Sequence, residues 1–145
     1  MATGLSAHFG AMAGNNAWAN HRLLTACQAL SPEAFAAPRT GFFPSLRATL
    51  NHILWVDRYY IDALHRDPTV LSRYDEPAPD FPDAESLYAA QSASDRRLVD
   101  FCERQTDASL AEPLVLPRPN RTPPPTPVAS VLEHLFQHQV HHRGQ

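Results

Sequence analysis

Eight histidines stand out in this sequence of 145 residues, and four of them lie among the last twelve residues. Imidazole nitrogens are common ligands of transition metals. On a helical wheel, His138 and His142 lie closest to the expected apolar face and one turn apart, whereas His134 and His141 lie toward its flank. The i, i+4 spacing of the inward pair resembles that of zinc-binding helices, so we expect two metal ligands here.

A third ligand has to come from another helix, because two imidazoles alone would hold a metal weakly. His52 is the best candidate. On a helical wheel it lies between Trp55 and Val56, within the broad apolar arc of its helix. Taken alone, His52 would be interpreted as a hydrogen-bonded core histidine. Burying three unpartnered imidazoles would cost about 1–3 kcal/mol each, and a shared cation would remove that cost. The three histidines together therefore favour a metal site.

Four helices separated by prolines are expected to position these residues. The first runs roughly over residues 5–30, and the second runs from an N-cap at Ser45 to about Arg66. The third starts near Asp80 or Asp83. The fourth starts with Thr126 as N-cap and Pro127 as its first residue, and continues to the end of the chain.

The segments between these helices are expected to be irregular. Residues 67–82 are polar and proline-rich and are expected to form a loop, and residues 113–125 form at most a short edge hairpin. The sequence thus predicts an all-α protein of one domain, residues 1–145. Its expected architecture is an antiparallel four-helix bundle with one long proline-rich connection before the last helix.

Composition excludes several classes of function. All 12 basic residues are arginine, so lysine Schiff-base chemistry and a P-loop lysine are excluded. The formal net charge of -3 argues against nucleic-acid binding, and the apolar stretches are too short for membrane insertion. Cys27 and Cys102 form no CxxC pair, and no secretory signal is evident, so we expect a cytoplasmic protein with reduced thiols.

Three segments resemble the DinB/YfiT-like family of bacterial metal-binding four-helix-bundle proteins. They are NNAWANHRLL near the start, LNHILWVDRYY in the middle and HLFQHQVHHRGQ at the end. The resemblance implies a homodimeric metalloprotein with His52, His138 and His142 as its ligands. Family members usually continue the last helix by another turn or more, so the resemblance also implies that the chain is truncated after Gln145.

A site with three histidine ligands leaves at least one coordination position open, as catalytic metal sites do. Its cofactor would be a divalent transition metal, with zinc or nickel as first candidates. Because the resemblance includes thiol-dependent S-transferases and isomerases, we expect a metal-dependent enzyme that acts on a low-molecular-weight thiol and a small electrophile, or a hydrolase. The alternatives are a non-catalytic metal-binding stress-response protein and a dimerisation module with incidental histidines.

Several neighbouring residues are candidates for supporting roles. Tyr59 and His141 are possible general bases, while Gln139 and Arg143 could orient ligands or could serve packing and surface charge. Asp57 is expected to pair with an arginine. In addition, Trp18 and Trp55 could line a substrate pocket or belong to the core, and the proline-rich segment 117–127 could shape the mouth of the site.

Overall fold

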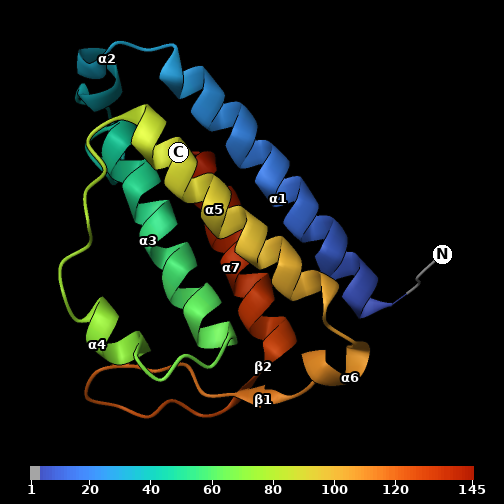
Figure 1. Cartoon of the computed structure of the whole chain (residues 1–145). Coiled ribbons are helices and arrows are strands. Elements are labelled where there is room, and N and C mark those ends of the chain that lie inside the picture. Colours follow the sequence, from blue (N-terminus) through green and yellow to red (C-terminus); the bar gives the residue numbers. More distant parts are fainter. Residues whose placement is uncertain (1–3) are drawn as a thin grey trace.

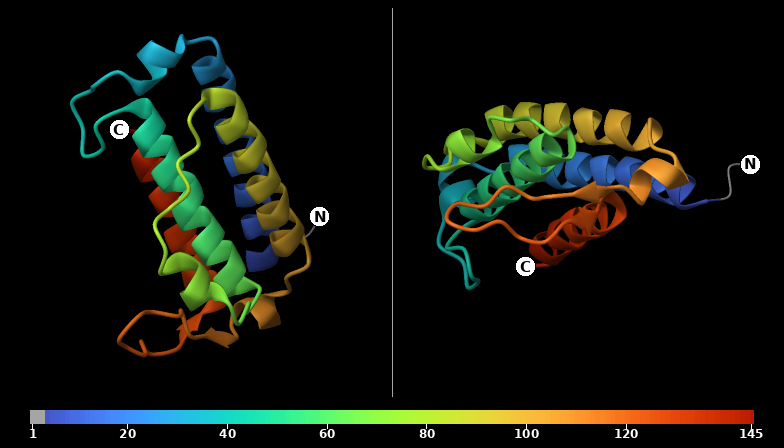
Figure 2. Two further views of the ribbon diagram at one scale, coloured as in Figure 1. Left: turned by 60° about the vertical axis from the view of Figure 1, so that its left-hand side comes forward. Right: turned by 90° about the horizontal axis from the view of Figure 1, so that it is seen from below.

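Four long helices dominate the computed structural model, which describes residues 4–145 (Figure 1). They are α1 (Leu5–Gln28), α3 (Leu46–Leu64), α5 (Ala84–Glu103) and α7 (Val128–Arg143). α1 packs on α5, α5 on α3, α3 on α7, and α7 on α1. α1 and α7 run in one direction and α3 and α5 in the other, so the connection from α3 to α5 is long as well (Figures 1 and 2). The prediction of an all-α fold is confirmed.

Side-chain caps define where two of these helices begin. The Ser45 hydroxyl accepts a hydrogen bond from the Ala48 amide at 3.0 Å, as predicted for the helix that carries His52. One of the two predicted starts of the third helix is also correct, because the Asp83 carboxylate accepts from the Ser86 amide at 2.7 Å.

The predicted start of the last helix is wrong by one residue, since Pro127 rather than Thr126 is the N-cap. Thr126 and Pro127 form strand β2 (Thr126–Pro127), which pairs with β1 (Pro113–Leu114) in a short antiparallel hairpin. α7 therefore begins at Val128, whose amide donates to the Glu112 carbonyl at 3.0 Å instead of to a threonine cap. The hairpin supplies the hydrogen-bond partner that the predicted cap would have provided.

Three short helices were not predicted: α2 (Pro32–Ala36), α4 (Val70–Tyr74) and α6 (Asp107–Leu110). α4 lies within the segment 67–82 that was expected to be a loop. Its Arg73 and Tyr74 side chains donate to the buried Asp62 carboxylate on α3 at 2.5 and 2.8 Å. This tertiary anchor, rather than local helix propensity, explains why the polar segment folds as a helix against α3.

The core consists of two apolar clusters along the helices. One gathers Phe9, Ile61, Leu98, Leu132 and their neighbours, and the other gathers Leu24, Phe35, Ile53, Leu87 and theirs. Cys27 and Cys102 are buried, free thiols within these clusters. No helix within residues 4–145 combines the length and hydropathy needed to cross a membrane.

Replacing Ser45 with alanine is expected to lower the free energy of unfolding by about 1 kcal/mol, because the first turn of α3 loses its side-chain cap. Urea denaturation followed by circular dichroism measures the change. Ser45→Thr keeps the hydroxyl and should retain most of the stability. Equal losses in the two variants would contradict the capping role.

Candidate metal centre

The three histidines predicted as ligands lie together between α3 and α7. One potential ligand nitrogen from each of His52, His138 and His142 lies within 4.8 Å of the others. The Nε2 atoms of His52 and His138 are 3.1 Å apart, and the ring of His142 is centred 4.7 Å from His52 and 4.4 Å from His138. The i, i+4 pair thus meets the α3 histidine as the wheel predicted, in a cluster that could hold a metal ion.

The surroundings of His52 and His138 favour the neutral imidazole, the form that binds metals. Burial, together with His142 and His52, lowers the pKa of His138 to about 4. Burial and His142 also lower the pKa of His52. The Nε2 atom of His138 faces that of His52, and its Nδ1 is buried without a hydrogen-bond partner among residues 4–145. The donor set therefore fits a transition metal.

An aromatic side chain covers one side of the cluster. Phe43, from the segment before α3, has its ring centre 4.4 Å from that of His52 and 5.6 Å from that of His142. At the chain end, the Gln145 amide oxygen lies 2.8 Å from Nδ1 of His142. These contacts orient the imidazoles of His52 and His142.

The two candidate bases occupy different positions. The Tyr59 hydroxyl donates to the Pro117 carbonyl at 2.5 Å, and burial raises its pKa. His141 is exposed, with its ring centre 4.9 Å from that of His142. Within the described residues, neither side chain hydrogen-bonds to a histidine of the cluster.

Gln139 and Arg143 point away from the histidines into a buried polar network. Gln139 is fully buried, and its amide nitrogen donates to the Asp57 carboxylate. Nη1 of Arg143 donates to Gln139 Oε1 at 2.8 Å, and to the amide oxygens of Asn16 and Asn20 at 2.7 and 2.9 Å. Both residues therefore affect the histidines by holding the backbone of α7, not by contacting the rings.

The expectation that Asp57 pairs with an arginine is wrong. Its carboxylate accepts from two amides, those of Gln139 and, at 2.9 Å, Gln91 on α5. Arginine pairs form five residues further along α3, where Asp62 accepts hydrogen bonds from Arg73 and Arg97. The sequence places Asp57 at a side of the apolar arc of its helix, but the identity of its partners depends on how α5 and α7 pack against α3.

The sequence did not single out Asp95, Asn20 and Gln91 as members of this network. Asn20 donates to Asp95 at 3.0 Å, and Gln91 bridges Asp95 and Asp57. A signal was present, because Gln91 falls on the apolar stripe of its helix, where a polar residue needs a buried partner. The network joins all four long helices beside the histidine cluster.

Burial raises the pKa of Asp95 to about 6, although hydrogen bonds from Gln91 and Asn20 and the charge of Arg143 oppose the shift. The folded chain then keeps a proton between about pH 4 and 6 that the unfolded chain releases. The free energy of unfolding should fall as pH rises through this window, by on the order of 1 kcal/mol per pH unit. Asp95→Asn is expected to remove this decline in urea denaturation curves.

The matched control for that variant is Asp100→Asn, on the exposed side of α5. It should keep the wild-type pH dependence. Burial raises the pKa of the neighbouring Asp57 as well, so a residual slope can remain in Asp95→Asn. Identical pH profiles for wild type and Asp95→Asn would contradict the assignment.

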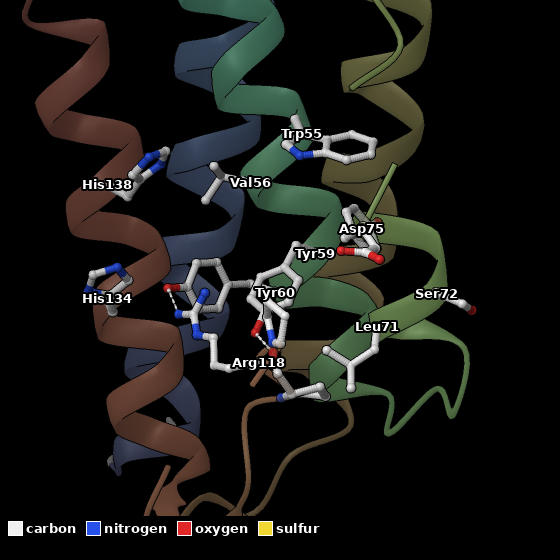
Figure 3. A pocket seen from close by; sticks show the side chains of 13 residues that line it. Trp55, Val56, Tyr59, Tyr60, Leu71, Ser72, Asp75, Arg118, His134 and His138 are labelled. Carbon is white, nitrogen blue, oxygen red and sulfur yellow. Dashed lines mark hydrogen bonds between the residues drawn. The ribbon is translucent and has the colours of Figure 1, made fainter. Parts of the chain in front are cut away.

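A cavity of about 630 Å³ adjoins the histidine cluster (Figure 3). His138 and His134 of α7 contribute to its lining, together with the aromatic residues Trp55, Tyr59, Tyr60 and Tyr74 and with residues of α4 and of the β1–β2 connection. Trp55 thus lines a pocket, which is one of the two positions predicted for it. Trp18 does not: it is 57% exposed on α1 and stacks with Arg22.

Together, the helical fold and the three clustered imidazoles define an all-α protein with a candidate transition-metal centre. A model of the DinB family matches residues 2–145, so the chain belongs to the DinB family, and the resemblance seen in the sequence is confirmed. A DinB-like protein from Bacillus cereus, known from its crystal structure, is similar with a TM-score of 0.65 and 20% sequence identity. The match covers 90% of this chain and 80% of that chain, and at this identity it supports the fold alone. No curated protein sequence matches the chain.

Proposed function

We propose that this protein is a metal-dependent enzyme whose divalent transition metal is held by His52, His138 and His142. The observation that carries the proposal is that one potential ligand nitrogen from each of these three histidines lies within 4.8 Å of the others. Three nitrogen ligands suit zinc or nickel and leave a coordination position open. A metal bound in this way would acidify a thiol or a water molecule.

We propose thiol S-transfer as the reaction, with hydrolysis as the related possibility. S-transfer joins the thiol sulfur to an electrophilic carbon, whose leaving group departs with the bonding electrons while the thiol proton passes to solvent. The chain's own contribution is to hold the histidines on two packed helices, to shield them with Phe43 and to place a substrate cavity beside His138. Tyr59 has a raised pKa and its hydroxyl already donates to Pro117, so no base is assigned to it.

Metal analysis of untagged protein tests the proposed metal site. About one equivalent of zinc or nickel per chain is expected. Less than about half an equivalent, unchanged in His138→Ala, would overturn the metal site and favour incidental histidines.

An activity screen of the metal-loaded protein tests the proposed reaction. Bacillithiol, mycothiol and glutathione are each combined with chlorodinitrobenzene, and simple esters test hydrolysis. Thiol consumption that depends on the metal and on His138 supports the enzyme. Metal binding without turnover of any pair would favour the alternative, a non-catalytic metal-binding stress-response protein.

The same proposal includes a four-helix bundle and a homodimer. The side-by-side packing of the four long helices supports the bundle, and the family resemblance supports the dimer. Light scattering coupled to gel filtration tests the dimer, and a monomer at all concentrations would contradict it.

A further inference from the structure

The cavity beside His138 contains an arginine that the sequence did not single out. Arg118 lies in the connection between β1 and β2, where Asn120 adopts a positive φ of 63° and Arg118 pairs with Arg121 as a β-bridge. The hydrogen bond from the Tyr59 hydroxyl to the Pro117 carbonyl ties this turn to α3. The turn is therefore held against the helix, with Arg118 directed into the cavity (Figure 3).

The Arg118 side chain is partly buried and has no carboxylate partner within residues 4–145. Its guanidinium lies 5.0 Å from the centre of the Tyr59 ring, and its Nη2 atom lies 3.5 Å from the Tyr60 hydroxyl. These contacts orient the planar group but leave most of its N–H donors free. A guanidinium fork with free donors in a cavity matches a carboxylate in geometry and charge.

The other lining groups define the shape of a ligand. His134 lies on α7 one turn before His138, with its ring centre 5.3 Å from that of Tyr60, so it adds a second polar group on the Arg118 side. Trp55 and Leu71 form apolar wall on the α3 and α4 side. Asp75 is the acidic residue of the lining and would repel a second anion there.

We propose that this cavity binds an organic monocarboxylate with an aromatic or similarly apolar body. The carboxylate pairs with Arg118 and His134, and the body packs against Trp55 and Leu71. The identification of this ligand as a substrate rests on the proposed function, since the cavity reaches the ligand candidate His138. The carboxylate site itself requires no metal.

Trp55 provides a direct reporter, because the chain has two tryptophans and Trp18 is exposed on α1, outside the cavity. In a Trp18→Phe background stripped of metal with EDTA, fluorescence titration compares three probes of matched size. These are 3-phenylpropionate, 3-phenylpropan-1-ol and 3-phenylpropylamine. The acid is expected to bind at least about ten-fold more tightly than the alcohol, because hydrogen bonds to charged groups are the stronger ones.

Two arginine variants test whether Arg118 is responsible for the preference for the acid over the alcohol. Arg118→Gln should bind acid and alcohol equally, whereas Arg121→Gln, an exposed neighbour in the same turn, should keep the preference for the acid. Equal affinities of the Trp18→Phe protein for acid and alcohol, tighter binding of the amine, or the same loss in both arginine variants would overturn the carboxylate site.

The test of the carboxylate site can fail or succeed independently of the test of the metal site. A preference for the acid in the metal-free protein supports the carboxylate site even where metal analysis finds no metal. Conversely, one equivalent of metal with no saturable binding of any probe would leave the metal site in place and overturn the carboxylate site.

Discussion

Replacing His52 with alanine is expected to weaken metal binding by about a thousand-fold or more. His52 is the member of the cluster contributed by α3, and its loss leaves only the i, i+4 pair on α7. Changes to residues that merely support metal ligands typically cost about 10–100-fold in affinity, so the loss of a ligand should cost more. Competition with a chromophoric chelator measures the affinity for zinc and for nickel.

The matched control for this experiment is His134→Ala. His134 lies one turn before His138 on α7 but outside the cluster, so the variant should bind metal as the wild type does. Circular dichroism checks that both variants fold, which is expected because His52 is only partly buried. Retention of wild-type affinity in His52→Ala, or an equal loss in His134→Ala, would contradict the ligand assignment.

The candidate ligands could be predicted because helical periodicity fixes which residues share a face. The spacing of His138 and His142 and the wide apolar arc around His52 are properties of single helices. The structure adds that α3 and α7 run in opposite directions and pack together, which brings the two faces into contact. Thus the site residues follow from local patterns once two helices are known to be neighbours.

The remaining features depend on contacts between segments far apart in the sequence. α4 forms where Arg73 and Tyr74 reach Asp62, and the start of α7 moves to Val128 because the β1–β2 hairpin precedes it. Arg118 is directed into the cavity by a hydrogen bond between a loop carbonyl and Tyr59. None of these contacts has a periodic signature, so the sequence pattern could not reveal them.

The side chains of Gln139 and Arg143 show that, even within one helix, the sequence pattern does not reveal which residues of other helices a side chain contacts. The sequence places both beside the helix face that carries the histidines, which made them candidates for orienting ligands or for packing and surface charge. The structure places the polar groups of α1, α3 and α5 opposite them. Their partners are therefore Asp57, Asn16 and Asn20, and they stabilise the end of α7 on which His142 lies.

Arg143→Ala is accordingly expected to lower the free energy of unfolding of the metal-free protein by about 3 kcal/mol at neutral pH. Three amide oxygens would lose their donor, and each buried polar atom left unpaired costs about 1–3 kcal/mol. The charge of Arg143 also lowers the pKa of both Asp57 and Asp95 against the effect of burial. These carboxyl groups can take up a proton when the guanidinium is removed, which limits the loss.

Thermal and urea unfolding measure this effect, and a fall in Tm of about 10 °C is expected for a chain of this size.

Arg96→Ala, which removes an exposed arginine from α5, should change stability by no more than about 0.5 kcal/mol. Arg143→Lys keeps the positive charge but replaces the planar guanidinium with a compact ammonium on a differently shaped side chain, so its stability should lie between those of the two alanine variants. Saturating zinc should recover part of the stability of Arg143→Ala, because the proposed metal site exists only in the folded protein and includes His142 in the last turn. Equal stabilities of Arg143→Ala and Arg96→Ala would show instead that the end of α7 is held by its apolar contacts alone.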